Sequence, residues 1–294
     1  MRIVKRIEKE ANNKYIIELN DAAIVEAAMF RHQESIHFCI PSQVGCGMGC
    51  KHCSTTYSSI PFIRNIFFDE FKEMIDLIKR QLDNNMTKLT LSFSGHGEAL
   101  LNWDNVKKAI DYYYDVFSNI YITTIGVSCT LNELLSLKTN LPDLYFSIHA
   151  SSDFKRKIII PMADNDQIAN LQQILDFGKK YSRNGRRIIL NYMICNINSS
   201  YDDVTNLVSL CRNVDYPLEL RLTRYIDIGQ KNGIESVDDA VVDNFIYQLS
   251  RGINNNNISV RLSRLEGEDM GIACGQMRAS MQAVINEVEN ENNN

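Results

Sequence analysis

The sequence lacks several features that would place it in a special class of protein. It has no run near the roughly 18 uninterrupted apolar residues of a membrane-spanning helix, and its start, MRIVKRIEKE, contains no apolar secretory segment. Eight cysteines in 294 residues are too few for a disulfide scaffold. The 31 Lys and Arg against 36 Asp and Glu give a net charge of −5, so contact with nucleic acid would need a local basic patch. These absences predict a cytoplasmic protein with reduced thiols and no membrane contact.

The residues that are present form an alternating series of strand-like and helix-like segments. A hydrophobic share of 45% and a charged share of 23% are typical of a folded globular chain. After short strands in the first 40 residues, six strand–helix units follow one another. The predicted helices are Asp69–Asp83 (with Asp69 as N-cap), Asn105–Phe117, Leu131–Leu137, Gln167–Tyr181, Asp202–Arg212 and Val237–Leu249. The predicted strands of these units are Lys88–Ser94, Ile120–Thr124, Leu144–Ile148, Arg187–Ile194, Leu218–Arg224 and Ile258–Leu262.

This alternation predicts an α/β fold with a parallel sheet and helices outside it. We expect a partial (β/α)6 barrel over residues 36–280, preceded by a small β-rich extension (1–35) and followed by a disordered tail (281–294). A doubly wound sheet is the alternative. In such barrels the chemistry lies where strands end and loops begin.

The strongest motif is a loop with three cysteines, Cys46, Cys50 and Cys53, in the spacing C-x3-C-x2-C. Three thiolates can hold three irons of a [4Fe-4S] cube, and the fourth iron is then left without a protein ligand. An open coordination position is typical of a catalytic metal centre. The vacant iron could chelate S-adenosylmethionine, whose reductive cleavage would give a 5′-deoxyadenosyl radical.

The alternative for this loop is a zinc site completed by His52 or by a distant cysteine. Zinc knuckles favour C-x2-C pairs over C-x3-C, so the spacing favours the iron–sulfur cluster. Of the other cysteines, Cys129, Cys195 and Cys211 lie in apolar or helical context and are predicted to be core residues.

Polar residues follow several strands and are candidates for holding the cofactor. Gly97-Glu98 lies on a glycine turn, where the carboxylate could receive an ammonium group. Thr123, Ser147 and His149 end the next two strands, and small hydroxyls there can bond a ribose or a carboxylate. Local turn capping is the alternative for these hydroxyls.

Several blocks together resemble the radical-SAM RNA adenine methyltransferases of the RlmN/Cfr type. The matching segments are Glu26 with Cys39, Ser42–Cys46, Gly45–Thr55, Gly97–Leu100 with Asn102, Thr124–Gly126, Ser147–Ala150 with Asp153, Arg156 and Pro161, and Ala273–Gln276. The cluster loop alone marks only the superfamily. Cys39 together with the ACGQ block around Cys274 makes the pattern specific.

The resemblance implies catalysis through two cysteines. Cys274 takes a methyl group from one S-adenosylmethionine, and a second molecule supplies the radical that activates that methyl group for addition to adenine. Cys39 resolves the resulting protein–RNA adduct and leaves a Cys39–Cys274 disulfide. Glu26 takes the proton-acceptor position. The positions that contact S-adenosylmethionine are Gly97, Glu98, Thr123, Ser147, Ile148 and His149.

The resemblance also implies the partners: ribosomal or transfer RNA as substrate, and an electron donor such as a flavodoxin or ferredoxin. We expect a monomer. Family members usually begin with a helical domain that helps to hold RNA, whereas the first cluster cysteine here is already residue 46. The Arg224-Tyr225 pair is closer to the carbon-8 branch and Leu101–Asn105 to the carbon-2 branch, so both positions of adenine stay open. A radical-SAM enzyme with another substrate and a non-catalytic, metal-bearing RNA-binding protein are the alternatives.

Overall fold

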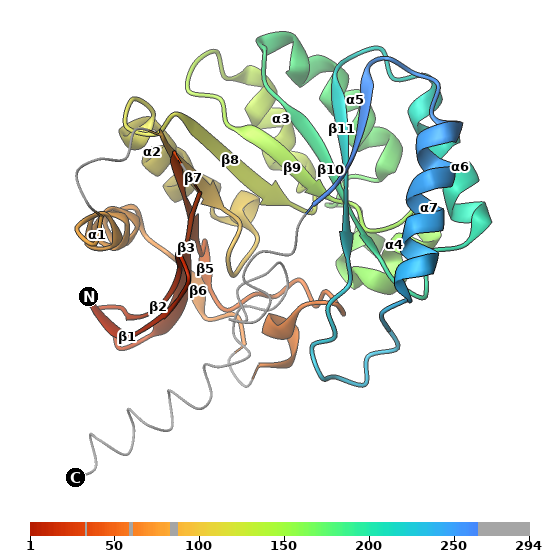
Figure 1. Cartoon of the computed structure of the whole chain (residues 1–294). Coiled ribbons are helices and arrows are strands. Elements are labelled where there is room, and N and C mark those ends of the chain that lie inside the picture. Colours follow the sequence, from red (N-terminus) through yellow and green to blue (C-terminus); the bar gives the residue numbers. More distant parts are fainter. Residues whose placement is uncertain (33, 59–60, 83–87, 264–294) are drawn as a thin grey trace. The chain divides into compact units, whose positions relative to one another are not determined.

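The computed structural model describes residues 1–32, 34–58, 61–82 and 88–263 as a mixed α/β protein with parallel strands (Figure 1). The chain divides into two compact units. Among the described residues, the first unit contains 1–47 and 53–122, and the second contains 48–52 and 123–263. The strands and helices of the two units are described separately.

The first unit is built on a sheet with the strand order β1-β2-β3-β4-β7-β8. The strands up to β4 pair antiparallel, and β4, β7 and β8 run parallel. The strand bounds are β1 Arg2–Lys9, β2 Asn12–Glu18, β3 Ile24–Arg31, β4 Ser35–Ile40, β7 Lys88–Phe93 and β8 Asn119–Thr124. A separate pair joins β5 (Gln43–Val44) to β6 (Arg64–Asn65), and the helices are α1 Phe68–Lys79 and α2 Trp103–Tyr113.

Apolar side chains fix one face of this sheet against the helical segments. Phe71 of α1 meets Phe93 of β7 edge-on with ring centroids 5.2 Å apart, and Phe38 of β4 meets Phe117, just after α2, at 5.5 Å. Because side chains alternate along a strand, the neighbours of Phe38 at positions 37 and 39 point to the opposite face. We call that opposite face the inner face of the first unit.

The second unit contains four parallel strands in the order β9-β10-β11-β12. Their bounds are β9 Asp143–Ser147, β10 Ile188–Ile194, β11 Leu218–Arg224 and β12 Ile258–Leu262. The helices are α3 Ser128–Ser136, α4 Asp153–Ile159, α5 Leu171–Tyr181, α6 Tyr201–Arg212 and α7 Asp239–Gly252. Ring contacts of 5.8 Å between Phe146 and Phe177 and of 5.7 Å between Tyr192 and Phe245 attach α5 and α7 to the sheet.

Capping residues decide where two of these helices begin. Asn170 accepts a hydrogen bond from the Gln173 amide, and the Gln173 side chain accepts one from the Asn170 amide, so α5 starts with a capping box. Ser200 and Asp203 do the same for α6. Each box leaves the preceding strand-to-helix loop in a fixed position at the carboxyl end of the sheet.

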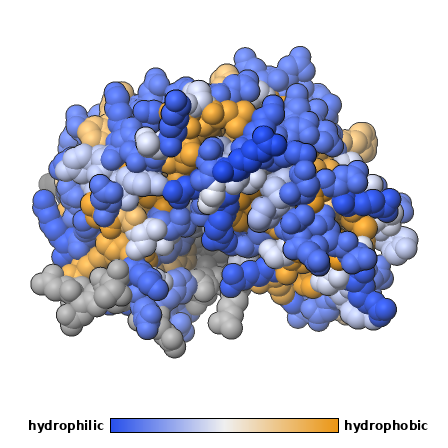
Figure 2. All heavy atoms as spheres, turned by 90° about the horizontal axis from the view of Figure 1, so that it is seen from above, coloured by the Kyte–Doolittle hydropathy of each residue, from blue (hydrophilic) through white to orange (hydrophobic). Residues whose placement is uncertain are grey.

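The α/β class and the strand–helix alternation are confirmed. Within each unit the parallel strands follow chain order, and the described strands of either unit show no reversal of the kind a doubly wound sheet requires. The prediction that Asp69 caps its helix is wrong, because α1 begins one residue earlier and the N-cap is Phe67. No described helix combines the length and apolar character needed to cross a membrane. Hydrophilic side chains cover most of the face shown in Figure 2, with hydrophobic ones between them.

Candidate active site

The inner face of the first unit holds a buried carboxylate, Glu26 on β3. Lys14 of β2 places its Nζ 3.2 Å from Glu26 Oε1, and His96 Nε2 lies 3.8 Å from Oε2. All three side chains are buried. A charged group removed from water needs a compensating partner. The ammonium of Lys14 therefore stabilises negative charge on Glu26.

Cys39 of β4 lies on the same face as Glu26. Ala28 of β3 is the register partner of both Lys14 and Cys39, so these three residues form one row across three strands. Cys39 is 6% exposed, and its Sγ lies 3.1 Å from the Ser94 hydroxyl. The structure thus brings two of the predicted catalytic residues, Glu26 and Cys39, to one face of one sheet. The third, Cys274, lies outside the described residues.

The glycine turn after β7 connects Glu26 with the predicted cofactor position at Glu98. Gly97 has φ +93°, and a Cβ there would lie 2.6 Å from the Gln43 side chain, so only glycine fits. Gln43 Oε1 accepts a hydrogen bond from the Glu98 amide at 3.0 Å. Glu98 Oε1 in turn accepts from the Leu100 amide and caps the short 3-10 helix that follows. The turn is rigid, and His96, next to Gly97, reaches Glu26.

The cysteine loop is held close to the chain that follows it. Gly45 has φ +83°, and a Cβ there would lie 2.1 Å from the Pro61 carbonyl oxygen. Cys46, Cys50 and Cys53 are all half-buried rather than sealed in the core. Cys46 and Cys53 belong to the first unit and Cys50 to the second. Three accessible soft thiols from one short loop are a donor set that suits an iron–sulfur cluster.

The zinc alternative asks for a compact group of ligands around one ion. Among the described residues, no three His, Cys, Asp or Glu side chains gather closely enough to hold a single metal ion. The irons of a cube occupy separate corners, so cluster ligands stand further apart than zinc ligands. Burial lowers the pKa of His52, the proposed fourth zinc ligand, to about 4. Its ring packs edge-on against that of His149 with centroids 4.6 Å apart.

Residues 48–52 are anchored within the second unit near the end of β9. The Lys51 amide donates to the Ile159 carbonyl at 2.9 Å, and the Lys51 carbonyl accepts from Asn232 at 2.7 Å. Together with the His52–His149 contact, these bonds place the middle of the cysteine loop beside the predicted cofactor residues Ser147, Ile148 and His149.

The backbone at the end of β9 has an unusual conformation, which hydrogen bonds fix. His149 has φ +48°, and its Nδ1 accepts from the Met193 amide at 3.2 Å. The amides of Ile148 and His149 donate to the Asn191 carbonyl at 3.1 and 3.2 Å. Burial, with smaller contributions from His52 and Arg156, holds the pKa of His149 well below its ordinary value. A neutral, fixed imidazole therefore stands at this strand end.

Asn198 is the clamp that joins the ends of β9 and β10. Its side-chain amide donates to the His149 carbonyl at 2.8 Å and to the Met193 carbonyl at 2.6 Å, and its Oδ1 accepts from the Cys195 amide at 2.8 Å. The side chain is fully buried. Sequence inspection missed Asn198, Lys14 and His96. A lysine in the apolar segment KYIIEL was the one available signal, because a buried lysine requires a partner.

Two other predictions have mixed outcomes. Thr124 Oγ1 accepts from the Gly126 amide at 2.8 Å, which is the turn-capping alternative, while Thr123 is half-buried at the end of β8.

Cys195 and Cys211 are buried, and burial raises the pKa of each thiol to about 11. The prediction that Cys129 is a core residue is wrong: α3 buries Thr130 and Leu131 and leaves Cys129 exposed.

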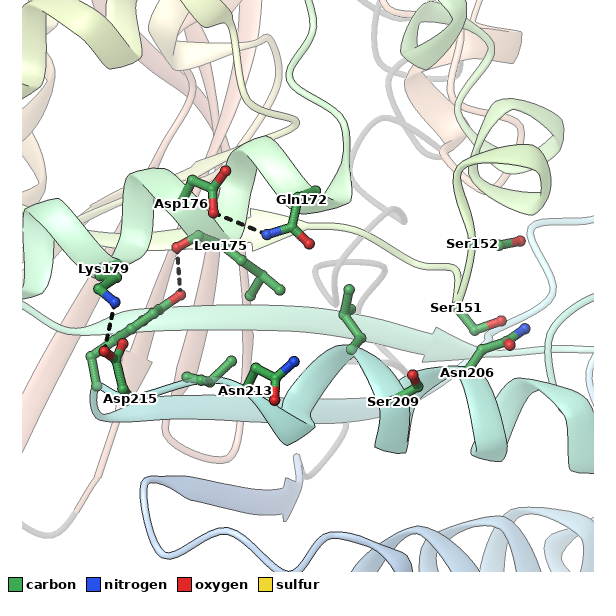
Figure 3. A pocket seen from close by; sticks show the side chains of 13 residues that line it. Ser151, Ser152, Gln172, Leu175, Asp176, Lys179, Asn206, Ser209, Asn213 and Asp215 are labelled. Carbon is green, nitrogen blue, oxygen red and sulfur yellow. Dashed lines mark hydrogen bonds and ion pairs between the residues drawn. The ribbon is translucent and has the colours of Figure 1, made fainter.

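A cavity of about 540 Å³ lies between α5 and α6, on the helical side of the second unit (Figure 3). Four of its polar side chains pair with one another: Lys179 with Asp215 at 2.6 Å, and Gln172 with Asp176 at 2.9 Å. The cavity contains no thiol and none of the predicted site residues. We therefore do not assign the chemistry to it.

Comparison with known proteins shows the family of this chain. The model of the Radical SAM superfamily matches residues 40–216. A relative from Finegoldia magna described as "Probable dual-specificity RNA methyltransferase RlmN" is 30% identical over 94% of this chain and 78% of its own length. A relative of the same description from Cytophaga hutchinsonii is 28% identical over 93% of this chain and 74% of its own.

Solved structures show the same fold. The crystal structure of a radical SAM methyltransferase from Sphaerobacter thermophilus superimposes with a TM-score of 0.80 over 95% of this chain and 81% of that one, at 21% identity. Native anSMEcpe with bound AdoMet superimposes with a TM-score of 0.53 over 75% of this chain and 62% of that one, at 14% identity.

Proposed function

This chain belongs to the radical SAM superfamily and, within it, to the RlmN family of RNA methyltransferases, and we propose that it methylates carbon 2 or carbon 8 of an adenosine in structured RNA. Large-subunit ribosomal RNA is the first expected substrate and transfer RNA the second. Its cofactors, a [4Fe-4S] cluster on Cys46, Cys50 and Cys53 and S-adenosylmethionine, supply the methyl group and a 5′-deoxyadenosyl radical when bound.

The protein's own residues then carry the methyl group. Cys274 holds it as a thioether, because an sp² carbon of adenine cannot displace it from a sulfonium whereas a thiolate can. Loss of a hydrogen atom from that methyl group would leave a carbon radical that adds to adenine and links Cys274 to the RNA. The linked ring then loses one proton and one electron, and a one-electron acceptor such as the oxidised cluster would take the electron. Cys39 breaks the link by forming a disulfide with Cys274.

Glu26 is the group that removes the proton from the attacked adenine carbon. The observation that supports both assignments is the common inner face: Lys14 and Cys39 lie in one row with Ala28, and Glu26, two residues from Ala28 on β3, contacts Lys14 on the same face. A carboxylate paired to a buried ammonium is available as a base, and a thiol on the same face is available to resolve the adduct.

The remaining assignments concern the cofactor and the partners. Gly97, Glu98, Thr123, Ser147, Ile148 and His149 contact S-adenosylmethionine. The turn and strand-end geometries described above fix the backbone at Gly97, Glu98, Ile148 and His149. A flavodoxin or ferredoxin supplies the electron, and the enzyme acts as a monomer with its barrel over residues 36–280.

The test is mass spectrometry of RNA nucleosides from cells with and without the gene, and from cells carrying Cys274→Ala or Cys39→Ala. The gene should add 2-methyladenosine or 8-methyladenosine, Cys274→Ala should add neither, and Cys39→Ala should yield protein crosslinked to RNA. Cys129→Ala, which changes an exposed cysteine outside the proposed site, is the matched control and should methylate normally.

Two outcomes would contradict the proposal. If the active, cluster-containing enzyme cleaves S-adenosylmethionine but leaves every adenosine unchanged, the chain is a radical-SAM enzyme with another substrate. If Cys274→Ala still methylates RNA, the thioether route is wrong.

A further inference from the structure

A chain of hydrogen bonds runs from the Cys39 thiol to a histidine on the same strand. Cys39 Sγ lies 3.1 Å from Ser94 Oγ, Ser94 Oγ lies 2.7 Å from Ser92 Oγ, and Ser92 Oγ lies 2.7 Å from His37 Nε2. Tyr121 Oη lies 2.7 Å from the same ring nitrogen. All the oxygen and nitrogen distances are those of good hydrogen bonds. Two serine hydroxyls thus connect one thiol to one imidazole.

The sheet register explains why these residues meet. Cys39 of β4 pairs with Ser92 of β7, and Ser92 pairs with Tyr121 of β8, so the three side chains point to the same face. His37 and Ser94 lie two residues along their strands from Cys39 and Ser92 and share that face. Two serines bridge the gap between His37 and Cys39, because side chains two residues apart on a strand are roughly 6–7 Å from one another.

The far end of the chain of hydrogen bonds is fixed and closer to the surface than the thiol. The His37 ring stacks on Phe30 with centroids 5.6 Å apart and packs against Tyr121 at 5.2 Å. Cys39 and Ser92 are buried, whereas His37 and Tyr121 are half-buried. Among the groups that face His37 are Phe30 from β3, Thr90 and Ser92 from β7, and Tyr121 from β8. Tyr121 is the titratable group among them.

We infer that His37, Ser92 and Ser94 form a proton relay that deprotonates Cys39 for the resolving step. This inference rests on the role of Cys39 proposed above. The thiol donates to Ser94, Ser94 donates to Ser92, and Ser92 donates to His37 Nε2, so the thiol proton ends on the imidazole. The hydroxyl of Ser92 also lies 3.0 Å from the Phe38 carbonyl and can turn to it when the ring is protonated. Histidine suits this position because its ring nitrogen can both accept and release a proton.

The chemistry of the step balances. The S–H bond of Cys39 breaks, and the electron pair of its thiolate forms the S–S bond with Cys274. The bond between Cys274 sulfur and the methylene carbon breaks, its electron pair stays on carbon, and a proton from solvent completes the methyl group. Two sulfurs are oxidised and the carbon is reduced. A dithiol reductant then restores both cysteines. The relay residues act through Cys39 and are positioning residues.

The first test measures the reactivity of Cys39 toward iodoacetamide across pH, by peptide mass spectrometry on the reduced, cluster-containing enzyme without RNA. The exposed Cys129 in the same sample is the internal reference. Only thiolates react, so the rate reports the ionised fraction. We expect His37→Gln to slow Cys39 alkylation at pH 7 by about tenfold relative to Cys129, the effect of one unit of thiol pKa.

A second variant removes one serine from the middle of the hydrogen-bonded path and leaves the imidazole in place. Ser94→Ala should reproduce the loss, and the double variant His37→Gln, Ser94→Ala should be no slower than either single one, because both break the same path. His32→Gln, at an exposed histidine near the start of β4, is the matched control and should leave the alkylation profile unchanged. An unchanged profile in Ser94→Ala or His37→Gln would overturn the relay, as would additive effects in the double variant.

The relay can also be followed in turnover. His37→Gln should accumulate RNA crosslinked to Cys274, as Cys39→Ala does, while methylation of Cys274 in the absence of RNA keeps its normal rate. Failure of the wild-type enzyme to methylate RNA would overturn the proposed function and leave the alkylation result to decide on the relay. Normal RNA methylation with no accumulation of adduct in His37→Gln would overturn the relay alone.

Discussion

Each unit of the molecule buries one carboxylate against a lysine, and the two pairs differ in how tightly the carboxylate is held. In the second unit, Asp203 accepts from Lys155 at 2.7 and 2.9 Å, from the Ser151 and Ser200 hydroxyls at 2.5 Å and from the Ser200 amide at 3.0 Å. In the first unit, Glu26 lies 3.2 Å from Lys14 and 3.8 Å from His96. The two contacts of Glu26 are longer than those of Asp203, and they join Glu26 to charged or ionisable groups.

The contacts of Asp203 suit a structural carboxylate, and those of Glu26 are compatible with the role of base that we propose for it. Asp203 closes the capping box of α6 and joins it to α4, so its short hydrogen bonds fix two helix starts. Glu26 sits between an ammonium and an imidazole on a strand, with His96 carried by the glycine turn. A base must give its proton away after taking it. Longer contacts to Lys14 and His96 are compatible with that exchange.

The strongest test of the difference between Glu26 and Asp203 is to neutralise each carboxylate in turn. Glu26→Gln leaves the buried Lys14 ammonium without its carboxylate and should therefore also lower stability, but per folded molecule it should lower RNA methylation by about 10²–10⁴-fold, the range of a lost general base. Asp203→Asn should lower the free energy of unfolding and keep the rate of RNA methylation per folded molecule. Nucleoside mass spectrometry and urea unfolding on the same preparations measure both quantities. Equal loss of activity in the two variants would show that Glu26 has no special role.

The next effect is on stability and isolates Lys14. Lys14→Met leaves the buried carboxylate of Glu26 without its ammonium and should cost about 3–5 kcal/mol in the free energy of unfolding. Adding Glu26→Gln should recover most of that loss, because no buried charge then remains. Equilibrium unfolding in urea of the wild type, both single variants and the double variant gives the coupling energy. Additive losses would mean that the two residues do not depend on each other.

The smallest effect is the pH dependence of Asp203. Burial alone would raise its pKa, but hydrogen bonds from Lys155, Ser151 and Ser200 outweigh burial and hold it below the ordinary value. The stabilisation is therefore complete above the unfolded pKa of about 3.9 and is lost as the pH falls through the lower folded value. Asp203→Asn should cost about 1.5–3 kcal/mol at neutral pH.

That deficit should shrink as the pH drops below about 4. Urea unfolding of the wild type and Asp203→Asn at a series of pH values measures it. If the difference in free energy of unfolding between the two proteins stays constant down to acidic pH, the charge of Asp203 does not contribute to stability.

Periodicity predicted the elements well where they are long and regular. The strands β9 to β12 and the helices α5 to α7 lie within a few residues of the predicted segments. The helix α4 (Asp153–Ile159) was missed because it is only 7 residues long, too short to show a repeating apolar face. The strand β1 (Arg2–Lys9) was missed because its side chains are mostly exposed and charged.

The site could be predicted only in part from sequence. The cysteine spacing and the resemblance located Cys39, Glu26 and the cluster loop, because those signals are local. His37 contacts Ser92, which lies 55 positions away in the sequence. Lys14 and Cys39 lie in one row only because β2 and β4 both pair with β3 in the observed register. Periodicity tells which face a side chain takes but not which neighbour it meets on the next strand.

The clamp at Asn198 has a consequence for how the protein ages in storage. Two of its contacts require an N–H donor, and hydrolysis of the side-chain amide to a carboxylate would remove both donors at once. A negative oxygen would then face the carbonyl oxygens of His149 and Met193. Deamidation at this one buried position would loosen the left-handed turn beside it, and slow hydrolysis of a single amide would then disturb the strand end that we propose contacts S-adenosylmethionine.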